Sequence, residues 1–440
     1  MNWQQLLSPQ RIGQKQQPSK EPSRSAFEQD YDRIIFSHPF RKLQDKTQVH
    51  PLPETDFVHT RLTHSLEVSS VGRSLGKRVG EIILQRHPEL TSNFSLFDFG
   101  AIVAAASLAH DLGNPPFGHA GENAISDFFA HHPVGQSFKE KVTEPQWADL
   151  ISFEGNAQGF RVLNKNQYGL KLSFATLGAF TKYPCPSFFL QRDKSKRSQK
   201  KFGFFESEKG IFNEVAQQLE LLTVSQNVFS RHPLAFLVEA ADDICYSIID
   251  LEDGCSLGLV SYEEAKGLFE NVITKNKSKL GKLQHLNSKQ EKIGYLRALA
   301  IGDLMEECCS LFLDKENQIL AGKFDQALAD HCPSHEPLNQ IIKISREKIY
   351  RARQVVEIEA TGHAVLPGLL EEFLLAGEHL VKKSTSRKYS NLSMLLPEDT
   401  HWNIQQHPEP YLIARNIIDF ISGLTDRHAI GLFRKIKGVR

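Results

Sequence analysis

Apolar residues in this chain recur at the three- and four-residue steps of an α-helix, and this period restricts the folds it can adopt. The clearest stretch, Val58–His87, predicts one long helix. One face of it carries a row of side chains: His64, Val68, Val71, Leu75, Val79 and Ile82. Alternation of apolar and polar residues, the pattern of a half-buried strand, nowhere continues beyond about five residues. We therefore expect an all-α fold.

Similar patterns predict helices along most of the remaining chain. One covers Phe97–His110, and another begins at Pro233 and ends at Gly254. Further helical segments are expected at 123–150, 153–163, 261–349 (interrupted by a charged linker at 274–292), 350–395, 411–421 and 425–436. Residues 1–27 are rich in Ser, Pro, Gln and Lys, which predicts a polar, partly ordered N-terminal arm.

Composition limits which kinds of partner and which cellular compartment we expect for this protein. Lys plus Arg and Asp plus Glu number 52 each, and the formal net charge of +0 supports neither disorder nor a generally nucleic-acid-binding surface. No apolar run reaches the roughly 18 residues of a membrane span, and the N-terminus lacks the apolar segment of a signal peptide. Six cysteines without CxxC spacing predict reduced thiols. We expect a cytoplasmic globular protein with no membrane partner.

The segment 107–123, SLAHDLGNPPFGHAGEN, contains the most informative polar residues. His110 and Asp111 are adjacent at a predicted helix end, where an imidazole and a carboxylate can hold a divalent cation. His119 and Glu122 lie one turn apart after a Pro-Pro turn, and they form a pair suited to proton transfer. The alternative for an isolated His-Asp pair is a helix terminus that these side chains merely cap.

Two other predicted helices bring further candidate ligands. His64 shares the apolar face of its helix, where a buried core histidine is the ordinary alternative. Asp242, Tyr246 and Asp250 are spaced four and four, so they share one face of the 233–253 helix. Acids on helices normally face solvent, but Asp242 lies beside an apolar row. Together the imidazoles of His64 and His110 and two carboxylates suit Mn²⁺, Fe²⁺, Ni²⁺, Co²⁺ or Zn²⁺, or Mg²⁺ through water.

A basic segment interrupts the helices in the middle of the chain. Between Gln191 and Phe202 it has six basic residues against one acid, with Lys201 as the last of them, and Lys182 precedes it. A solvated surface loop is the plain interpretation. A lysine cluster that faces phosphate is the functional one.

The order H…HD…D is that of the HD-domain phosphohydrolases. The wider set RKLQDKTQV, RLTHSLEV, AHDLGNPPFGHAGE, FEGNAQGFRVL, FTKYP, KKFGFF, EAADDICYSIIDLEDG and SGLTDRHA resembles the bacterial deoxyguanosine triphosphate triphosphohydrolases, or dNTP triphosphohydrolases, from about residue 28 to about residue 435. The resemblance implies an HD-domain helical core over 28–260, helical N- and C-terminal extensions, the latter over 261–440, and a homo-oligomer, often a hexamer. It implies cleavage of a dNTP into deoxynucleoside and triphosphate.

Residue by residue, the resemblance assigns roles to the candidates. The metal ligands would be His64, His110, Asp111 and Asp242, and Glu122 would orient and tune His119 as the acid–base pair near the attacked phosphorus. The implied substrate contacts are Gln48 on the sugar 3′-hydroxyl, Tyr246 and Asp250 against the deoxyribose, and Arg61, Lys182, Tyr183 and Lys201 around the phosphates. Asp243 stands where some relatives carry a lysine for the triphosphate. The residues that recognise the base are not identifiable from these motifs.

Two alternatives remain open at this point. One is an HD-domain hydrolase of another nucleotide, such as a 5′-nucleotidase or a guanosine tetraphosphate hydrolase. The other is a regulator that binds nucleotide or single-stranded DNA without catalysis. Single-stranded DNA, which some relatives bind, and a second dNTP are left open as effectors of an active enzyme.

Overall fold

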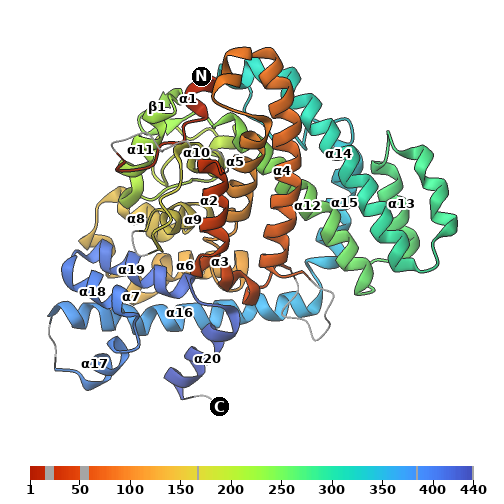
Figure 1. Ribbon diagram of the computed structural model, residues 1–440. Helices are drawn as coiled ribbons and strands as arrows, with labels where there is room; N and C mark the ends of the chain where they lie inside the picture. The colour runs from red at the N-terminus through yellow and green to blue at the C-terminus, as the bar shows by residue number, and fades with distance from the viewer. Residues whose placement is uncertain (15–23, 50–58, 166–167, 383–384, 439–440) are drawn as a thin grey trace.

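The computed structural model describes residues 1–14, 24–49, 59–165, 168–382 and 385–438. Within these ranges the regular secondary structure is helical apart from one short antiparallel ribbon, in which β1 (Thr223–Ser225) pairs with β2 (Val228–Phe229). The expectation of an all-α fold is confirmed (Figure 1). None of the helices in the described ranges has the length and apolar character needed to cross a membrane. All six cysteines are free thiols.

The α-helices of the described ranges follow one another along the chain. In order they are α1 (Trp3–Leu6), α2 (Ala26–Ile35), α3 (His38–Lys42), α4 (Arg61–Arg86), α5 (Leu96–Ala109), α6 (Gly118–His131), α7 (Pro133–Gln136), α8 (Glu144–Ile151), α9 (Gly155–Asn164), α10 (Phe174–Phe180), α11 (Lys209–Gln218), α12 (Pro233–Ser256), α13 (Tyr262–Val272), α14 (Lys289–Leu320), α15 (His335–Ile344), α16 (Arg353–Lys382), α17 (Arg387–Ser393), α18 (Glu398–Gln406), α19 (Pro410–Ser422) and α20 (Asp426–Lys437). A π-helical segment, Ser345–Ile349, joins α15 to the turn before α16.

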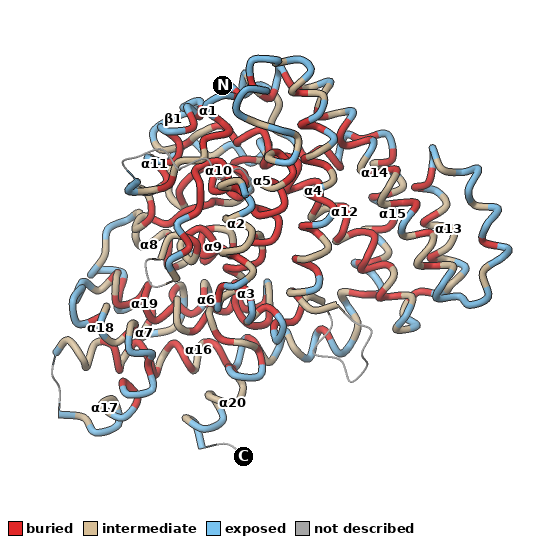
Figure 2. The backbone as a smooth tube through the Cα atoms, in the orientation of Figure 1, coloured by how far each residue is buried: buried red, intermediate tan, exposed pale blue. Residues whose placement is uncertain are grey.

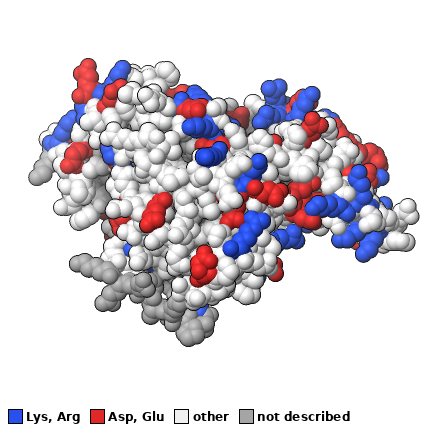
Figure 3. All heavy atoms as spheres, turned by 90° about the horizontal axis from the view of Figure 1, so that it is seen from above, with Lys and Arg blue, Asp and Glu red and all other residues white. Residues whose placement is uncertain are grey.

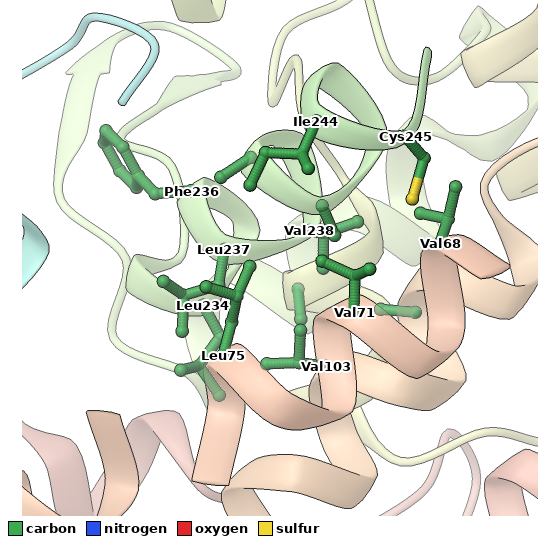
Figure 4. Close-up of a cluster of buried hydrophobic side chains, with 14 of the residues drawn as sticks. Val68, Val71, Leu75, Val103, Leu234, Phe236, Leu237, Val238, Ile244 and Cys245 are labelled. Atoms are coloured by element: carbon green, nitrogen blue, oxygen red, sulfur yellow. The ribbon is translucent and has the colours of Figure 1, made fainter. Parts of the chain in front are cut away.

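Helices α4, α5 and α12 form the centre of the first hydrophobic core. Thr60 caps α4 with its hydroxyl, in a reciprocal arrangement with Thr63. The predicted row of α4 is buried from His64 to Val79, but at its end Ile83 is buried in place of the predicted Ile82, which is half-buried. The row packs with α5 and α12 through the apolar side chains in Figure 4, which include Val68, Val71, Leu75, Val103, Leu234, Leu237 and Val238. This packing brings the start of α4 and the end of α5 beside the middle of α12.

A second hydrophobic core lies below the first in Figure 1, where α6, α16 and α19 pack together. Its buried side chains include Ile125, Phe129, Leu366, Phe373 and Ile417, and buried positions recur along α16 in Figure 2. The first core draws its buried residues from positions 3 to 349 and the second from 117 to 429. The domain boundaries at 27 and 260 stay predictions.

Within the arm expected at 1–27, residues 1–14 pack on the first core: Trp3, Leu6 and Leu7 are buried, and Trp3 Nε1 donates a 3.0 Å hydrogen bond to Glu316. One expectation about a helix end is wrong. Helix α12 does not end at Gly254 but continues to Ser256. Gly254 instead permits close packing, since a Cβ there would lie 2.4 Å from Ile349 Cδ1.

Surface charge follows the neutral composition. On the face in Figure 3, basic and acidic side chains are interspersed, and they are most numerous toward the side formed by α13, α14 and α15. Such a mixed surface agrees with the absence of a net charge.

Candidate metal and nucleotide site

The first turn of α4, the C-terminal end of α5 and the middle of α12 bring the four predicted metal ligands together. The ligand atoms of His64, His110 and Asp111 all lie within 4.8 Å of one another. Asp242 Oδ1 lies 3.3 Å from His64 Nε2 and 3.5 Å from His110 Nε2. Three helices separated in sequence therefore place two imidazoles and two carboxylates around one point.

Neighbouring groups leave the ligand atoms free for a cation. His110 donates from Nδ1 to the Ser107 carbonyl at 2.7 Å, so its Nε2 faces Asp242 with a lone pair available. Asp111 is oriented by Arg61, whose Nη1 donates to Asp111 Oδ2 at 2.9 Å, and by the amide of Asn114. Two imidazoles and two carboxylates that converge in this way fit a divalent cation of the borderline class.

Both carboxylates of this cluster are held in the ionised form. Burial alone would raise the pKa of Asp111, but the cation of Arg61 and the imidazole of His110 outweigh it, and the pKa lies below its usual value. Burial is likewise outweighed at Asp242 by His110 and His64, and its pKa is well below the usual range. A metal ligand must be deprotonated, so this electrostatic environment favours metal binding.

A strained turn positions His119 beside the cluster. Phe117 and Gly118 both adopt left-handed backbone conformations, with φ of 66° and 56°, at the start of α6. The Phe117 amide donates to Asp426 Oδ1 at 3.1 Å, which holds the turn against the chain's C-terminal part. A Cβ at position 118 would lie 2.8 Å from Arg61 Nη2, so glycine is needed for space as well as for φ.

His119 and Glu122 form the predicted pair. His119 Nδ1 lies 2.9 Å from Glu122 Oε2, and the His119 side chain is 80% exposed while that of Glu122 is 10% exposed. Glu122 Oε1 accepts a 2.7 Å hydrogen bond from the Gly155 amide. Burial would raise the pKa of Glu122, but the hydrogen bond from His119 and the charge of Lys201 lower it below its usual value. An ionised carboxylate thus orients an imidazole that faces open space.

These groups line one cavity of about 530 Å³, which we call the first cavity. Of the predicted residues, it brings together His64, His110, Asp111, Asp242, His119, Glu122, Gln48, Arg61, Lys182, Tyr183, Lys201 and Tyr246. The volume lies within the usual range for a small-molecule site. Gln48 also carries a buried Oε1 for which no hydrogen-bond partner exists among the described residues.

The predicted phosphate-binding cations all have carboxylate partners. Glu239, fully buried, accepts from Arg197 at 2.5 Å and lies 3.2 Å from Lys182 Nζ, and Arg231 donates to its other oxygen at 2.6 Å. Burial at Glu239 is outweighed by these cations, so its pKa is far below the usual value. Lys201 Nζ lies 3.0 Å from Glu154 Oε2. Spacing alone did not identify Glu239 or Glu154 as a counterion. The one available signal was that Glu239 is an acid within the apolar run PLAFLVEAA.

Asp250, which is predicted to lie against the deoxyribose, is not among the residues that line the first cavity. It is buried behind Tyr350, whose hydroxyl donates to Asp250 Oδ2 at 2.7 Å, and Tyr350 rather than Asp250 lines the first cavity. Burial raises the pKa of Asp250 to about 8. Tyr246 lies beside Tyr350, with ring centroids 5.6 Å apart.

The sequence also missed one wall of the first cavity. Val355, Ile358 and Glu359 at the start of α16 line it, about a hundred residues beyond α12. No spacing pattern links them to the motifs, and only packing of α16 on α6 brings them here.

Comparisons with known proteins match this architecture. The profile of the HD domain matches residues 61–154, and that of the phosphohydrolase-associated domain matches residues 334–435. A deoxyguanosinetriphosphate triphosphohydrolase-like protein of Synechocystis is 41% identical over 450 residues, with all of both chains covered. One from Pseudomonas aeruginosa is 38% identical, covering all of this chain and 99% of its own. The deoxyguanosinetriphosphate triphosphohydrolase of Yersinia pseudotuberculosis is 31% identical over 93% of each chain.

Full-length identity at this level agrees with the helical HD-domain core and with the cluster of histidines and aspartates. Residues 61–154 contain His64, His110, Asp111, His119 and Glu122, so the matched domain carries most of the cluster. The chain belongs to the deoxyguanosinetriphosphate triphosphohydrolase family of the HD-domain superfamily.

Proposed function

We propose that this protein hydrolyses deoxynucleoside triphosphates at the α-phosphorus and releases the deoxynucleoside and intact triphosphate. The observation that carries the proposal is the first cavity, where the four predicted metal ligands, an imidazole–carboxylate pair and several cations line one space. The relatives' names make dGTP the first substrate to test.

The tetrad of His64, His110, Asp111 and Asp242 would hold the divalent cation. Such a cation lowers the pKa of the attacking water and neutralises charge on the α-phosphate. Arg61 donates to Asp111 and also lines the first cavity. It could therefore contact a phosphate while it keeps its bond to Asp111.

His119 and Glu122 would move the proton. Glu122 accepts the Nδ1 hydrogen of His119, which leaves Nε2 to exchange a proton with the water or with the departing 5′-oxygen. In the reaction a water oxygen bonds to the α-phosphorus, the bond from phosphorus to O5′ breaks, and the 5′-oxygen leaves as a hydroxyl. The imidazole is exposed to the first cavity, as proton exchange with substrate requires.

Selection of deoxyribose would come from Tyr246 and Tyr350. Both rings line the first cavity, and the buried Asp250 fixes the Tyr350 hydroxyl from behind. Aromatic rings held in place can exclude a ribose 2′-hydroxyl by leaving it neither room nor a partner.

Product analysis tests the proposal. The full chain is incubated with Mn²⁺ and each of the four dNTPs or GTP, and the products are separated by ion-exchange chromatography. We expect deoxynucleoside and triphosphate from at least one dNTP and intact GTP. Monophosphate with pyrophosphate, or orthophosphate, would contradict attack at the α-phosphorus and favour an HD hydrolase of another type. Absence of turnover even with mixed dNTPs or single-stranded DNA present would favour a non-catalytic regulator.

Further properties stay predictions: the native metal, an effector, cytoplasmic location and a homo-oligomer such as a hexamer.

A further inference from the structure

A second cavity of about 760 Å³ adjoins the first. The two cavities share four wall residues: Arg197, Lys200, Asp243 and Tyr246. Beyond this shared wall, the second cavity is lined by α15, the π-helical segment and residues 329–330. An anion that leaves the first cavity on this side therefore meets the second.

Cations dominate the lining of the second cavity. Arg197, Lys200, Lys343, Arg346 and Arg351 face three carboxylates, those of Asp243, Asp330 and Glu347. The side chains of Lys200, Lys343, Arg346 and Arg351 are exposed, and they form no hydrogen bond or ion pair with any residue that the structure describes. This is the reverse of the first cavity, where Arg61, Lys182 and Lys201 each have a carboxylate partner.

The backbone at this wall departs from regular helix. Residues Ser345–Ile349 form a π-helical turn. This conformation is rare in proteins as a whole, and where it occurs it is often at a functional site. Arg346 of this turn lines the second cavity, while Tyr350 directly after it lines the first. One irregular segment thus contributes a cation to one cavity and a substrate-facing ring to the other.

We propose that the second cavity is a binding site for the released inorganic triphosphate on its way out. The inference rests on the proposed function, which makes triphosphate the product. Triphosphate is a compact polyanion, and guanidinium and ammonium groups without carboxylate partners bind phosphate oxygens through charge-assisted hydrogen bonds. Uncompensated positive charge in a cleft also draws an anion toward it.

The test compares two double variants with matched loss of charge. Arg346→Ala with Arg351→Ala removes two cations of the second cavity. Lys348→Ala with Arg353→Ala removes two nearby cations that pair with Glu264 and Glu357 and do not line it. Binding of inorganic triphosphate to each metal-free protein is measured by titration calorimetry, and inhibition of dNTP turnover by added triphosphate is measured separately.

We expect the first variant to weaken triphosphate binding by about tenfold or more and the control by less than about twofold. Added triphosphate should inhibit the unsubstituted enzyme noncompetitively, because it can occupy the second cavity beside bound substrate. The KM for dNTP should stay within about twofold of the unsubstituted protein in both variants.

Three results would overturn the proposal. Unchanged triphosphate binding in the first variant would show that these arginines hold no product. A KM for dNTP that rises as much as the triphosphate Kd would assign them to the substrate. Tighter binding of a short single-stranded oligonucleotide than of triphosphate, lost in the same variant, would indicate a nucleic-acid surface. Failure of the proposed function is distinguishable, because it removes turnover while leaving the binding isotherm measurable.

Discussion

Tyr350 Oη donates a 2.7 Å hydrogen bond to Asp250 Oδ2, across 100 positions of sequence. The bond places the tyrosine ring between a buried carboxylate and the first cavity. Tyr350 lines the first cavity, whereas Asp250 does not. A residue outside every sequence motif thus fixes one wall of the proposed sugar site.

Tyr350→Phe should reduce both stability and sugar selection. The substitution leaves the buried Asp250 carboxylate without this donor, which should lower the free energy of unfolding by about 1–3 kcal/mol. The substitution also removes the hydrogen bond that holds the ring of residue 350 in place. The ring should then exclude a ribose 2′-hydroxyl less well, so the ratio of dGTP to GTP turnover should fall. The matched control is Tyr295→Phe, whose hydroxyl bonds the Lys279 carbonyl away from the site. Equal selectivity in the Tyr350 variant and the control would contradict the role given to Tyr350.

Asp111→Ala should remove the metal and turnover together. Asp111 is both a member of the tetrad and the partner of Arg61. Its loss removes one ligand and leaves the Arg61 guanidinium unpaired beside the metal position, where its charge would repel a cation. Metal content by elemental analysis after dialysis against Mn²⁺ and turnover of dGTP are the two measurements. Asp127→Ala, an exposed acid on α6, is the control and should keep both. Full metal content in the Asp111 variant would exclude Asp111 as a ligand.

Glu122→Ala should slow turnover while the metal stays bound. Glu122 contacts His119 and the Gly155 amide but none of the tetrad, so its loss affects proton transfer. We expect a decrease in kcat of about 10²–10⁴-fold, the usual effect of losing a general acid–base group. Glu140→Ala, an exposed acid, should have no effect. Loss of metal in the Glu122 variant would show that its role is not confined to His119.

Acid should destabilise the fold through His232. Its Nε2 donates to the Leu6 carbonyl and its Nδ1 accepts from the Leu234 amide, so the buried ring is neutral, and burial lowers its pKa to about 4. The unfolded chain takes up a proton near the ordinary value of about 6.5, whereas the folded chain does so only near 4. Stability should therefore fall as pH drops from about 6.5 to 4, by about 3 kcal/mol in total, and level off below.

His232→Asn isolates this contribution. Asparagine can still cap α12 by accepting from the Leu234 amide, but it does not titrate. Urea unfolding at several pH values should show a shallower loss of stability between pH 6.5 and 4 in the variant than in the unsubstituted protein. Parallel pH curves for the two proteins would contradict the assignment to His232.

Local patterns predicted much of the fold and of the metal cluster. His64 lies on the buried face of α4 because its spacing from Val68 and Val71 follows the helical period. The same reasoning placed Asp242 and Tyr246 on one face of α12, and both line the first cavity. Helical periodicity predicts toward which side of a helix a side chain points. Where helices converge, this was sufficient to predict which residues belong to the site.

What the sequence did not predict depends on contacts between distant segments. Trp3 is buried because its ring packs in the first core and its Nε1 donates to Glu316, although its neighbours in the sequence are polar. The basic segment contributes Arg197 and Lys201 to the first cavity, but their counterions Glu239 and Glu154 come from other elements. Asp250 shares a face with Asp242, yet Tyr350 covers it. Spacing within one helix carries no information about what packs against it.

The most direct test of α-phosphorus attack is turnover in water enriched in ¹⁸O. A dNTP that the enzyme cleaves is hydrolysed to completion in a single-turnover experiment, and both products are examined by mass spectrometry. If water attacks the α-phosphorus and the 5′-oxygen leaves, the triphosphate gains one ¹⁸O atom and the deoxynucleoside gains none. Label in the 5′-hydroxyl of the deoxynucleoside would place the attack at carbon and contradict the proposed reaction.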